Sequence, residues 1–190
     1  MPFKFGKVQG DFDIYACDKL KSLKNFPDYI GGAFEINGCN SLISLEGGPE
    51  EVGGSFSCQY NNSLASLKGA PEVLGKYSHF SCAFCPKITS IKELGKKQYH
   101  IHALVLRNLG IKTLEGCPQD IRNIVCRDCA NLISLKGCPP VLDESLNCSN
   151  CPKLTTLEGA PISIGGSLVC CDCENLVDFK GPEEVGYNKS

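Results

Sequence analysis

Apolar residues recur along this chain in one short phrase that occurs eight times. The phrase begins at Leu20, Leu42, Leu64, Ile88, Ile111, Leu132, Leu154 and Leu176, and reads LKSL, LISL, LASL, ITSI, IKTL, LISL, LTTL and LVDF. Successive copies begin 21 to 24 residues apart, most of them 22 apart. A fixed period of this length predicts a solenoid, in which each copy forms one coil and buries its apolar side chains against the neighbouring coils.

Before each phrase, apolar residues alternate with other residues, a period of two that is typical of a short strand. The apolar pairs are Phe12/Ile14, Phe34/Ile36, Phe56/Cys58, Phe80/Cys82, Leu104/Leu106, Ile124/Cys126, Leu146/Cys148 and Leu168/Cys170. A proline follows most phrases in one register, at Pro27, Pro49, Pro71, Pro118, Pro139, Pro161 and Pro182. Because proline fixes φ and lacks an N–H donor, the return path of each coil is expected to be extended or turn-like.

The predicted fold is mostly β: a solenoid of about eight 22-residue coils, with a parallel sheet on the concave face and extended or turn segments on the convex face. Little or no helix is expected. Residues 1–10 are predicted to form an N-terminal cap or partial repeat, with Phe3 and Phe5 as covers of the first coil; residues 11–187 form the solenoid and residues 188–190 a C-terminal tail. Glycine pairs such as Gly53-Gly54 precede strands, at corners where we expect φ above zero.

The copy VGGSFSCQYNNSLASL, residues 52–67, resembles the leucine-rich repeat core L-x-x-L-x-L-x-x-N-x-L-x-x-L, with Asn61 in the asparagine slot. The resemblance covers about residues 8 to 187. It is strongest to the short, helix-free repeats of bacterial effectors and to bacteriophage and bacterial proteins with the repeat SLEGAPxxVGGSFxC. It implies a curved solenoid that holds another protein, for example a phage-encoded inhibitor or modulator of a host defence protein. The chain departs from the pattern in its frequent cysteine at the asparagine slot, in Glu93 at a proline position, and in the stretched repeats around residues 76–111.

Composition narrows the classes of partner and the compartment. The 190 residues carry a net charge of −2, with both signs spread along the chain, so there is no basic footprint for nucleic acid. No apolar run reaches the roughly 20 residues of a membrane span, and none at the N-terminus is typical of a signal peptide. We therefore expect no nucleic-acid or membrane partner, and a cytoplasmic protein, of the producing or host cell, whose fourteen cysteines stay reduced.

Two C-x-x-C pairs, Cys126/Cys129 and Cys148/Cys151, have a spacing at which four thiolates bind zinc. When the copies are aligned, the first cysteine of each pair falls in the inward strand slot and the second in the asparagine slot. Other copies hold different residues in both slots, which favours buried structural thiols with no metal or cofactor. Stacked coils are close enough for disulfides, but side chains in parallel register point alongside one another, so free thiols are expected. A zinc protein is the alternative.

The outward positions of the strands are free to vary, and they form the surface on which we expect a protein partner to bind. The first copies are acidic there, the third and fourth are aromatic, and the fifth and sixth carry arginines. Tyrosine and arginine are enriched in binding hot spots. The candidate partner-binding residues are Tyr15, Glu35, Tyr60, Phe84, Arg107, Arg127 and Asp128.

The irregular segment from Gly95 to Asn108 is a second candidate, because insertions in repeat proteins tend to emerge as loops. It brings Tyr99, His100 and His102 together with two lysines. The two histidines are interpreted as pointing to opposite sides of the strand entry, which argues against a shared metal ion.

No motif indicates an enzyme. The chain has no glycine-rich phosphate loop followed by a helix, and no recurring serine, histidine and acid. The expected function is a non-enzymatic scaffold that binds an unidentified protein, as a monomer or weak homo-oligomer. A structural protein that self-associates through exposed solenoid ends or a sheet edge is the alternative.

Overall fold

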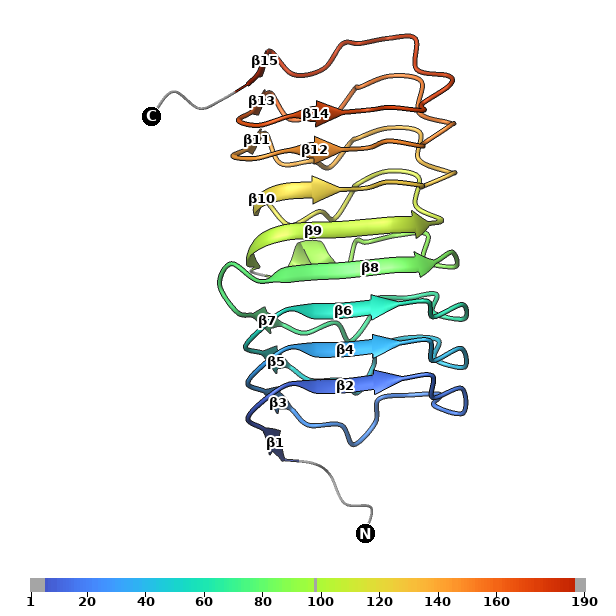
Figure 1. The fold of residues 1–190 in the computed structure, drawn as a ribbon, viewed down its shortest axis with the longest axis vertical. Helices are drawn as coiled ribbons and strands as arrows, with labels where there is room; N and C mark the ends of the chain where they lie inside the picture. The colour runs from blue at the N-terminus through green and yellow to red at the C-terminus, as the bar shows by residue number, and fades with distance from the viewer. Residues whose placement is uncertain (1–5, 98, 187–190) are drawn as a thin grey trace.

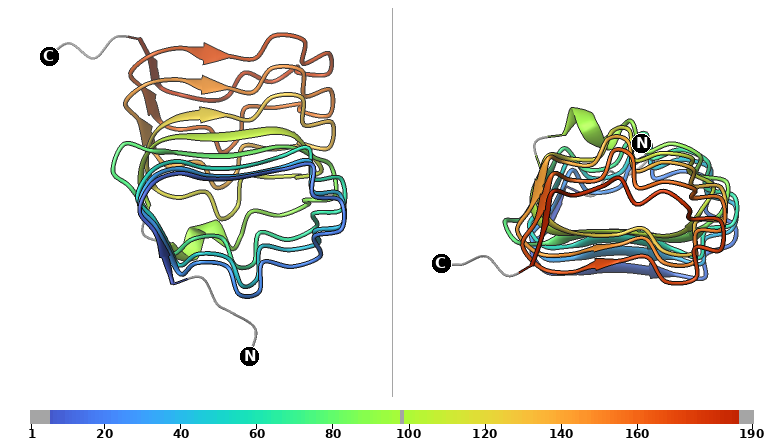
Figure 2. Two further views of the ribbon diagram at one scale, coloured as in Figure 1. Left: turned by 60° about the horizontal axis from the view of Figure 1, so that its bottom comes forward. Right: turned by 90° about the horizontal axis from the view of Figure 1, so that it is seen from above.

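The structure, a computed structural model, describes residues 6–97 and 99–186. The chain forms a β-solenoid of about eight turns, with all-parallel sheets and successive turns about 22 residues apart (Figure 1). Seen along the stack, the coils lie nearly over one another, with the large sheet along one long side and the return segments along the opposite side (Figure 2). The period in the sequence therefore predicted the fold. Phe3, Phe5 and the tail at residues 188–190 lie outside the described residues.

One strand from each coil joins an eight-stranded parallel sheet whose order follows the chain. In coils one to eight these strands are β2 (Phe12–Tyr15), β4 (Phe34–Asn37), β6 (Phe56–Gln59), β8 (His79–Cys85), β9 (His100–Leu109), β10 (Asp120–Val125), β12 (Leu146–Asn147) and β14 (Leu168–Val169). The register keeps equivalent residues of each copy side by side, for example Phe34 beside Phe56 and Phe56 beside Phe80. The alternation read from the sequence is therefore a true strand alternation.

Two smaller parallel sheets run along one short side of the coils, just before the strands of the large sheet. The first contains β1 (Lys7–Val8), β3 (Tyr29–Ile30), β5 (Glu51–Val52) and β7 (Val73–Leu74). The second contains β11 (Val141–Leu142), β13 (Ser163–Ile164) and β15 (Glu184–Val185). Each strand is two residues long, too short to be recognised from a period of two, so these sheets were not predicted.

The core is a set of columns that run through the stack. Phe56 lies between Phe34 and Phe80, with ring centroids 5.5 and 5.2 Å away, and all three side chains are at most 1% exposed. The leucines that open the repeated phrase, such as Leu42 and Leu64, are fully buried behind them. Each coil therefore depends on its neighbours for a covered apolar surface, as is expected of a quasi-one-dimensional fold.

The glycine pairs at the corners do not need positive φ, and that prediction was wrong. Gly31 and Gly53 are absent from the residues with a left-handed backbone. They are glycines because the coils come very close together there: a Cβ built on Gly53 would lie 2.3 Å from the carbonyl oxygen of Gly31. The N–H of Gly53 also donates to the carbonyl of Ile30, at 2.7 Å, which holds the two corners together.

The irregular segment from Gly95 to Asn108 is not a loop, contrary to the prediction. After a single 3-10 turn, η1 (Leu94–Lys96), most of it forms β9, which at ten residues is the longest strand described. Tyr99 is 2% exposed, packs against Phe80 and donates its hydroxyl to the carbonyl of Pro71 at 2.6 Å. The added residues therefore lengthen a central strand and fill the core.

His100 and His102 lie on the same side of β9, which corrects the interpretation that they point to opposite sides. They flank the buried Ile101, and residues two apart in a strand share a face. His102 stacks on His79 with centroids 5.3 Å apart and pairs with Glu144 at 3.2 Å. His100 pairs with Asp120 instead.

At the C-terminal end of the stack, apolar side chains of the last coil are exposed to solvent. Leu168 and Leu176 of the last coil are only partly buried, while Val177 is 82% and Phe179 69% exposed. At the other end Phe12 and Ile14 are partly buried.

Candidate binding surface

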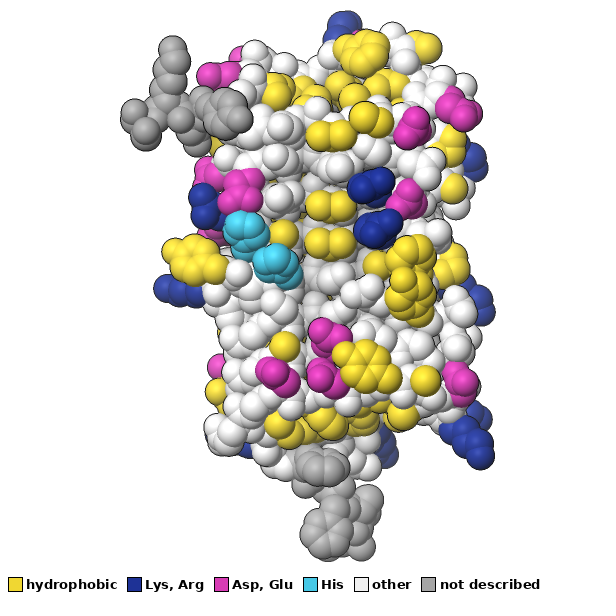
Figure 3. Space-filling model, in the orientation of Figure 1, with side chains coloured by type: hydrophobic (Ala, Val, Ile, Leu, Met, Phe, Trp, Pro, Cys, Tyr) yellow, Lys and Arg dark blue, Asp and Glu magenta, His cyan; other side chains and the backbone are white. Residues whose placement is uncertain are grey.

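The outward side chains of six strands of the large sheet, with the residues directly after them, form one continuous face, which we call the sheet face (Figure 3). The strands are β2, β4, β6, β8, β9 and β10. Tyr15 and Glu35 lie at its first two coils, where the Tyr15 hydroxyl donates to the Glu35 carboxylate at 2.6 Å. The Asn37 amide donates to the same carboxylate at 3.2 Å. The hydrogen bond to Glu35 raises the pKa of Tyr15 to about 12. The acidic end of the sheet face is thus an ordered set of side chains.

Along one edge of this face, at or just beyond the carboxyl end of each strand, runs a column of residues with left-handed backbone, one in each coil. Its members are Ala16, Gly38, Tyr60, Phe84, Asn108, Asp128, Asn150 and Asp172, with φ between 51° and 68°. The conformation turns the chain toward the next segment and lets N–H groups bond the neighbouring coil; the N–H of Tyr60, for example, donates to Ala83 at 2.9 Å. Glycine, asparagine and aspartate tolerate this conformation, whereas tyrosine and phenylalanine rarely adopt it.

Tyr60 and Phe84 occupy this unfavourable conformation with their rings in contact. The rings are stacked, with centroids 4.6 Å apart and an interplanar angle of 3°. Tyr60 is 55% exposed. We call this exposed stacked pair, at coils three and four, the aromatic step. The guanidinium carbon of Arg107 lies 5.4 Å from the centre of the Phe84 ring, within cation–π range.

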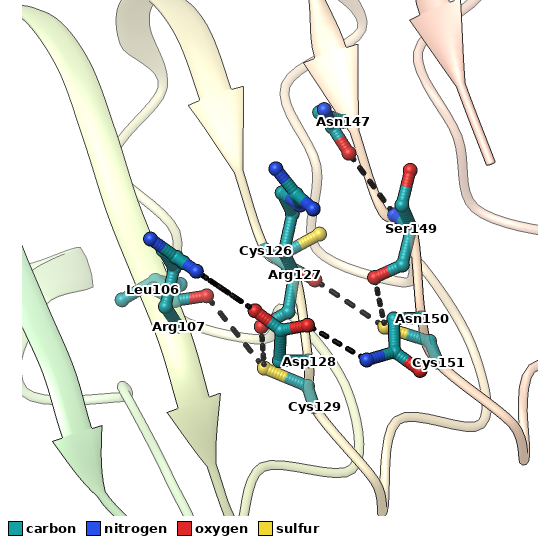
Figure 4. A network of polar contacts seen from close by, with 10 residues as sticks. All are labelled: Leu106, Arg107, Cys126, Arg127, Asp128, Cys129, Asn147, Ser149, Asn150 and Cys151. Carbon is teal, nitrogen blue, oxygen red and sulfur yellow. Dashed lines mark hydrogen bonds and ion pairs between the residues drawn. The ribbon is translucent and has the colours of Figure 1, made fainter. Parts of the chain in front are cut away.

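Arg107 in turn pairs with Asp128, which links coils four to seven into one polar chain (Figure 4). Arg107 Nη2 lies 3.2 Å from Asp128 Oδ2, and Asn150 Nδ2 donates to Asp128 Oδ1 at 2.8 Å. The hydrogen bond from Asn150, together with the one from Arg107, lowers the pKa of Asp128. Asp128 therefore stays ionised and neutralises Arg107.

Arg127 stands beside Arg107 in the next coil, two residues after the end of β10 (Figure 4), and within the described residues it has no such partner. Among the described residues its side chain forms no ion pair, and its Nε is buried without a hydrogen-bond partner. The charge of Arg127 acts on Asp128 only at longer range. Of the two arginines, Arg127 is the one whose guanidinium is available for a carboxylate from outside.

The seven residues predicted as partner-binding thus fall into two groups on one surface. Tyr15 and Glu35 form the acidic group, and the other five form what we call the aromatic–arginine strip: Tyr60, Phe84, Arg107, Arg127 and Asp128. Sequence reasoning missed Asn150, which holds Asp128. It also missed the left-handed column, although Gly38, Asn108 and Asp128 in the same register were a signal for it.

The cysteines of the asparagine slot act as hydrogen-bond donors inside the stack. Asn61, fully buried, donates from Nδ2 to the carbonyl of Ile36 at 2.8 Å and accepts from the N–H of Cys39 at 2.7 Å. The thiol of Cys151 donates to the equivalent carbonyl of Cys126 at 3.4 Å, and that of Cys129 to Leu106 at 3.6 Å. A thiol thus replaces the amide donor of asparagine in these coils.

Burial raises the pKa of these thiols. It reaches about 11 for Cys129 and about 12 for Cys151 and for Cys117, with desolvation as the first cause in each. All fourteen cysteines are free thiols in the structure. In the part of the chain that is described, no group of three or more His, Cys, Asp or Glu residues is placed to hold a metal ion.

A surface hollow of about 230 Å³ lies at the entry of β9 and β10, in the irregular segment and around it. It is lined by Lys76, Tyr77, His100, Ile101, Asp120 and Arg122. Three of its charged side chains already have partners: His100 pairs with Asp120, and Arg122 lies 3.4 Å from Asp143, outside the lining. It therefore offers less to a partner than the aromatic–arginine strip.

Comparison of the chain with families of known proteins, with curated protein sequences and with solved structures gave no match. The assignment of a β-solenoid therefore rests on the strand order and the repeat of the coils in this structure. The similarity to leucine-rich repeats remains a resemblance in sequence. None of the helices in residues 6–97 and 99–186 has the length and apolar character needed to traverse a bilayer.

Proposed function

We propose that the protein is a non-enzymatic scaffold that binds a protein partner through the sheet face, and that the aromatic–arginine strip makes the main contacts. The observation that carries the proposal is the stacked pair of Tyr60 and Phe84. Two bulky aromatic residues hold a left-handed backbone that costs about 1–2 kcal/mol each, and they lie at the surface. Strain of this kind concentrates at sites of function.

The strip has the composition of a binding hot spot. It combines aromatic rings with arginine, which are enriched where interfaces are buried. Arg107 is held over Phe84 and against Asp128, so little side-chain freedom is lost on binding. Arg127 is free to pair with a carboxylate of the partner. The resemblance to phage and bacterial repeat proteins extends the proposal to a modulator of a host protein, acting in the cytoplasm.

The test is affinity capture from a host lysate, followed by measurement of the dissociation constant with the captured protein. The variant Arg107→Glu with Arg127→Glu, which we call the basic variant because it changes the basic side chains, should raise the dissociation constant at least about tenfold. It removes both cations from the aromatic–arginine strip. Its melting temperature should stay within about 4 °C of the wild type, since both side chains are partly exposed.

The matched control is Lys87→Glu with Lys112→Glu, which changes the net charge equally at exposed lysines outside the sheet face. It should leave the dissociation constant unchanged. If the basic variant binds as tightly as the control, the sheet face is not the binding surface.

A further inference from the structure

Charges are segregated along the sheet face in a way that is complementary to itself. Asp13 and Glu35 lie at coils one and two, and Arg107 and Arg127 lie at coils five and six. Between them, at coils three and four, is the aromatic step of Tyr60 on Phe84. Figure 3 shows the acidic side chains and the arginines on the same face, separated along the stack. The aromatic step lies at the midpoint of the two charged groups.

This arrangement defines a two-fold axis. An axis parallel to the strands, between β6 and β8, places a second copy face to face with the order of its coils reversed. Strand β2 then faces β10 of the other copy, β4 faces β9, and β6 faces β8. Because this rotation keeps positions along the strand unchanged, each column of side chains faces the same column of the other copy. Such an interface is isologous, so every contact occurs twice.

The side chains brought together by this axis are complementary. Arg107 lies in the same column as Tyr15 and Asn37. The register of β9 and β10, continued by the hydrogen bond from Asn108 to the Arg127 carbonyl, places Arg127 in this column too. The Glu35 carboxylate lies against both Tyr15 and Asn37, so it is held where the arginines of the other copy arrive. The unpaired guanidinium of Arg127 thereby gains a carboxylate. At the axis, each aromatic step meets the step of the other copy.

The alternative face-to-face arrangement is disfavoured by the same charges. An axis parallel to the stack would set each coil against the identical coil, so that the acidic coils one and two of the two copies face each other and the arginine-bearing coils five and six do the same. Like charges placed together across an interface are destabilising. The distribution of charge therefore selects the reversed order of coils.

We propose that the sheet face binds a second copy of this chain as an antiparallel, face-to-face dimer. The inference rests on the proposed function in that both assign binding to the sheet face, so the dimer and a foreign protein partner compete for it. Six facing coils at about 4.8 Å each and four residues at about 3.3 Å each give about 400 Å² per copy. Stable interfaces bury about 800 Å² per partner, so the dimer is weak and depends on concentration.

The test is sedimentation analysis from about 10 μM to about 1 mM at low salt, where charge effects are least screened. The acidic variant, named for the acidic side chains that it changes, is Asp13→Lys with Glu35→Lys. The basic variant is Arg107→Glu with Arg127→Glu, as above. Each alone should raise the dimer dissociation constant at least about tenfold, because each sets like charges against each other. A mixture of the two should restore dimers, since Lys then faces Glu at one contact and Arg faces Asp or Glu at the other.

Controls with the same change of net charge elsewhere are Lys87→Glu with Lys112→Glu, and Glu50→Lys with Glu158→Lys. They should dimerise as the wild type does. The proposal is overturned if the wild type stays monomeric at about 1 mM. It is also overturned if both charge variants associate like the wild type, which is the result expected for association through the apolar solenoid ends. It is overturned as well if a mixture of the two variants does not form dimers. In each of these cases, binding of a foreign protein at the sheet face stays measurable in the capture assay, so the two proposals can fail separately.

Discussion

The ring of Tyr60 lies flat on the ring of Phe84, with centroids 4.6 Å apart, although both residues have φ near 55°. The other copies hold alanine, glycine, asparagine or aspartate at this position. The stack contributes about 0.5–1.5 kcal/mol, and the left-handed backbone opposes it with about 1–2 kcal/mol per residue. The two backbone costs exceed the gain from the stack, so the pair lowers the stability of the folded chain by about 0.5–3.5 kcal/mol, and its position at the surface favours a role in binding.

Replacing the pair should separate binding from stability. Tyr60→Asn with Phe84→Asn removes the stack but relieves the larger strain of the two backbones, so the free energy of unfolding should rise by about 0.5–3.5 kcal/mol. The dissociation constant for the captured partner should rise at least about tenfold. The control is Tyr77→Asn, because Tyr77 also has a left-handed backbone and is 73% exposed but lies between β7 and β8. A loss of several kcal/mol, or equal binding by both variants, contradicts this assignment.

The corner glycines should be intolerant of a methyl group for steric reasons alone. A Cβ on Gly53 would lie 2.3 Å from the Gly31 carbonyl oxygen, so Gly53→Ala should lower the free energy of unfolding by about 1–3 kcal/mol in urea denaturation. Gly10→Ala is the matched control, because a Cβ there meets nothing within 4 Å. It should change stability by less than about 0.5 kcal/mol. Equal losses from the two substitutions would show that backbone freedom, not close approach, explains the corners.

Asn61 should be replaceable by cysteine more readily than by alanine. Alanine leaves the Cys39 N–H and the Ile36 carbonyl without their partners in a buried site, a loss of about 1–3 kcal/mol for each group. Cysteine retains a donor to Ile36, as Cys151 does to Cys126. Chemical denaturation should therefore rank the wild type first, Asn61→Cys second and Asn61→Ala last. If the two variants are equally stable, the thiol does not replace the amide as a hydrogen-bond donor.

Stability should fall at alkaline pH because of the buried thiols. A thiol that ionises near pH 9 in the unfolded chain has a pKa of about 12 at Cys117 in the folded state. The folded state then holds more protons, so the free energy of unfolding is flat below about pH 9 and decreases from there until the folded pKa is passed. For Cys117 alone the loss is about 2 kcal/mol by pH 10.5.

The control for this pH dependence is Cys117→Ala, since Ala70 occupies the equivalent slot in another copy. This variant should lose about 2 kcal/mol less than the wild type between pH 8 and pH 10.5 in urea denaturation. Identical pH profiles would mean that the Cys117 thiol is already solvated in the folded state.

The sequence predicted what depends on the repeat and missed what depends on local backbone geometry. The alternation of Phe56 and Cys58 is repeated eight times, so strand, sheet and buried slots could be read directly. The left-handed conformation of Tyr60 could not be read from tyrosine, which ordinarily avoids it; only the aligned Gly38 and Asp128 indicate it. The close approach at Gly53 likewise depends on how tightly one coil lies on the next.

The prediction of a loop in the stretched repeats was wrong for a different reason. Gly95 to Asn108 breaks the period and loses the proline, which usually indicates a loop. Here Tyr99 packs on Phe80 in the core, and His100 and Ile101 pair with Asp120 and Ile121 of β10. Burial of an aromatic ring and the pairing with β10 outweighed the break in the pattern.

Oxidative footprinting of the complex with the captured partner tests the central claim, that the sheet face is the binding surface. Tyr60 is 55% exposed in the free protein, and Tyr77 and Phe179 are 73% and 69% exposed away from the aromatic–arginine strip. The account predicts that oxidation of Tyr60 and Phe84 drops several-fold on binding while that of Tyr77 and Phe179 is unchanged. Unchanged oxidation of Tyr60, with protection of Tyr77 or Phe179, would contradict it.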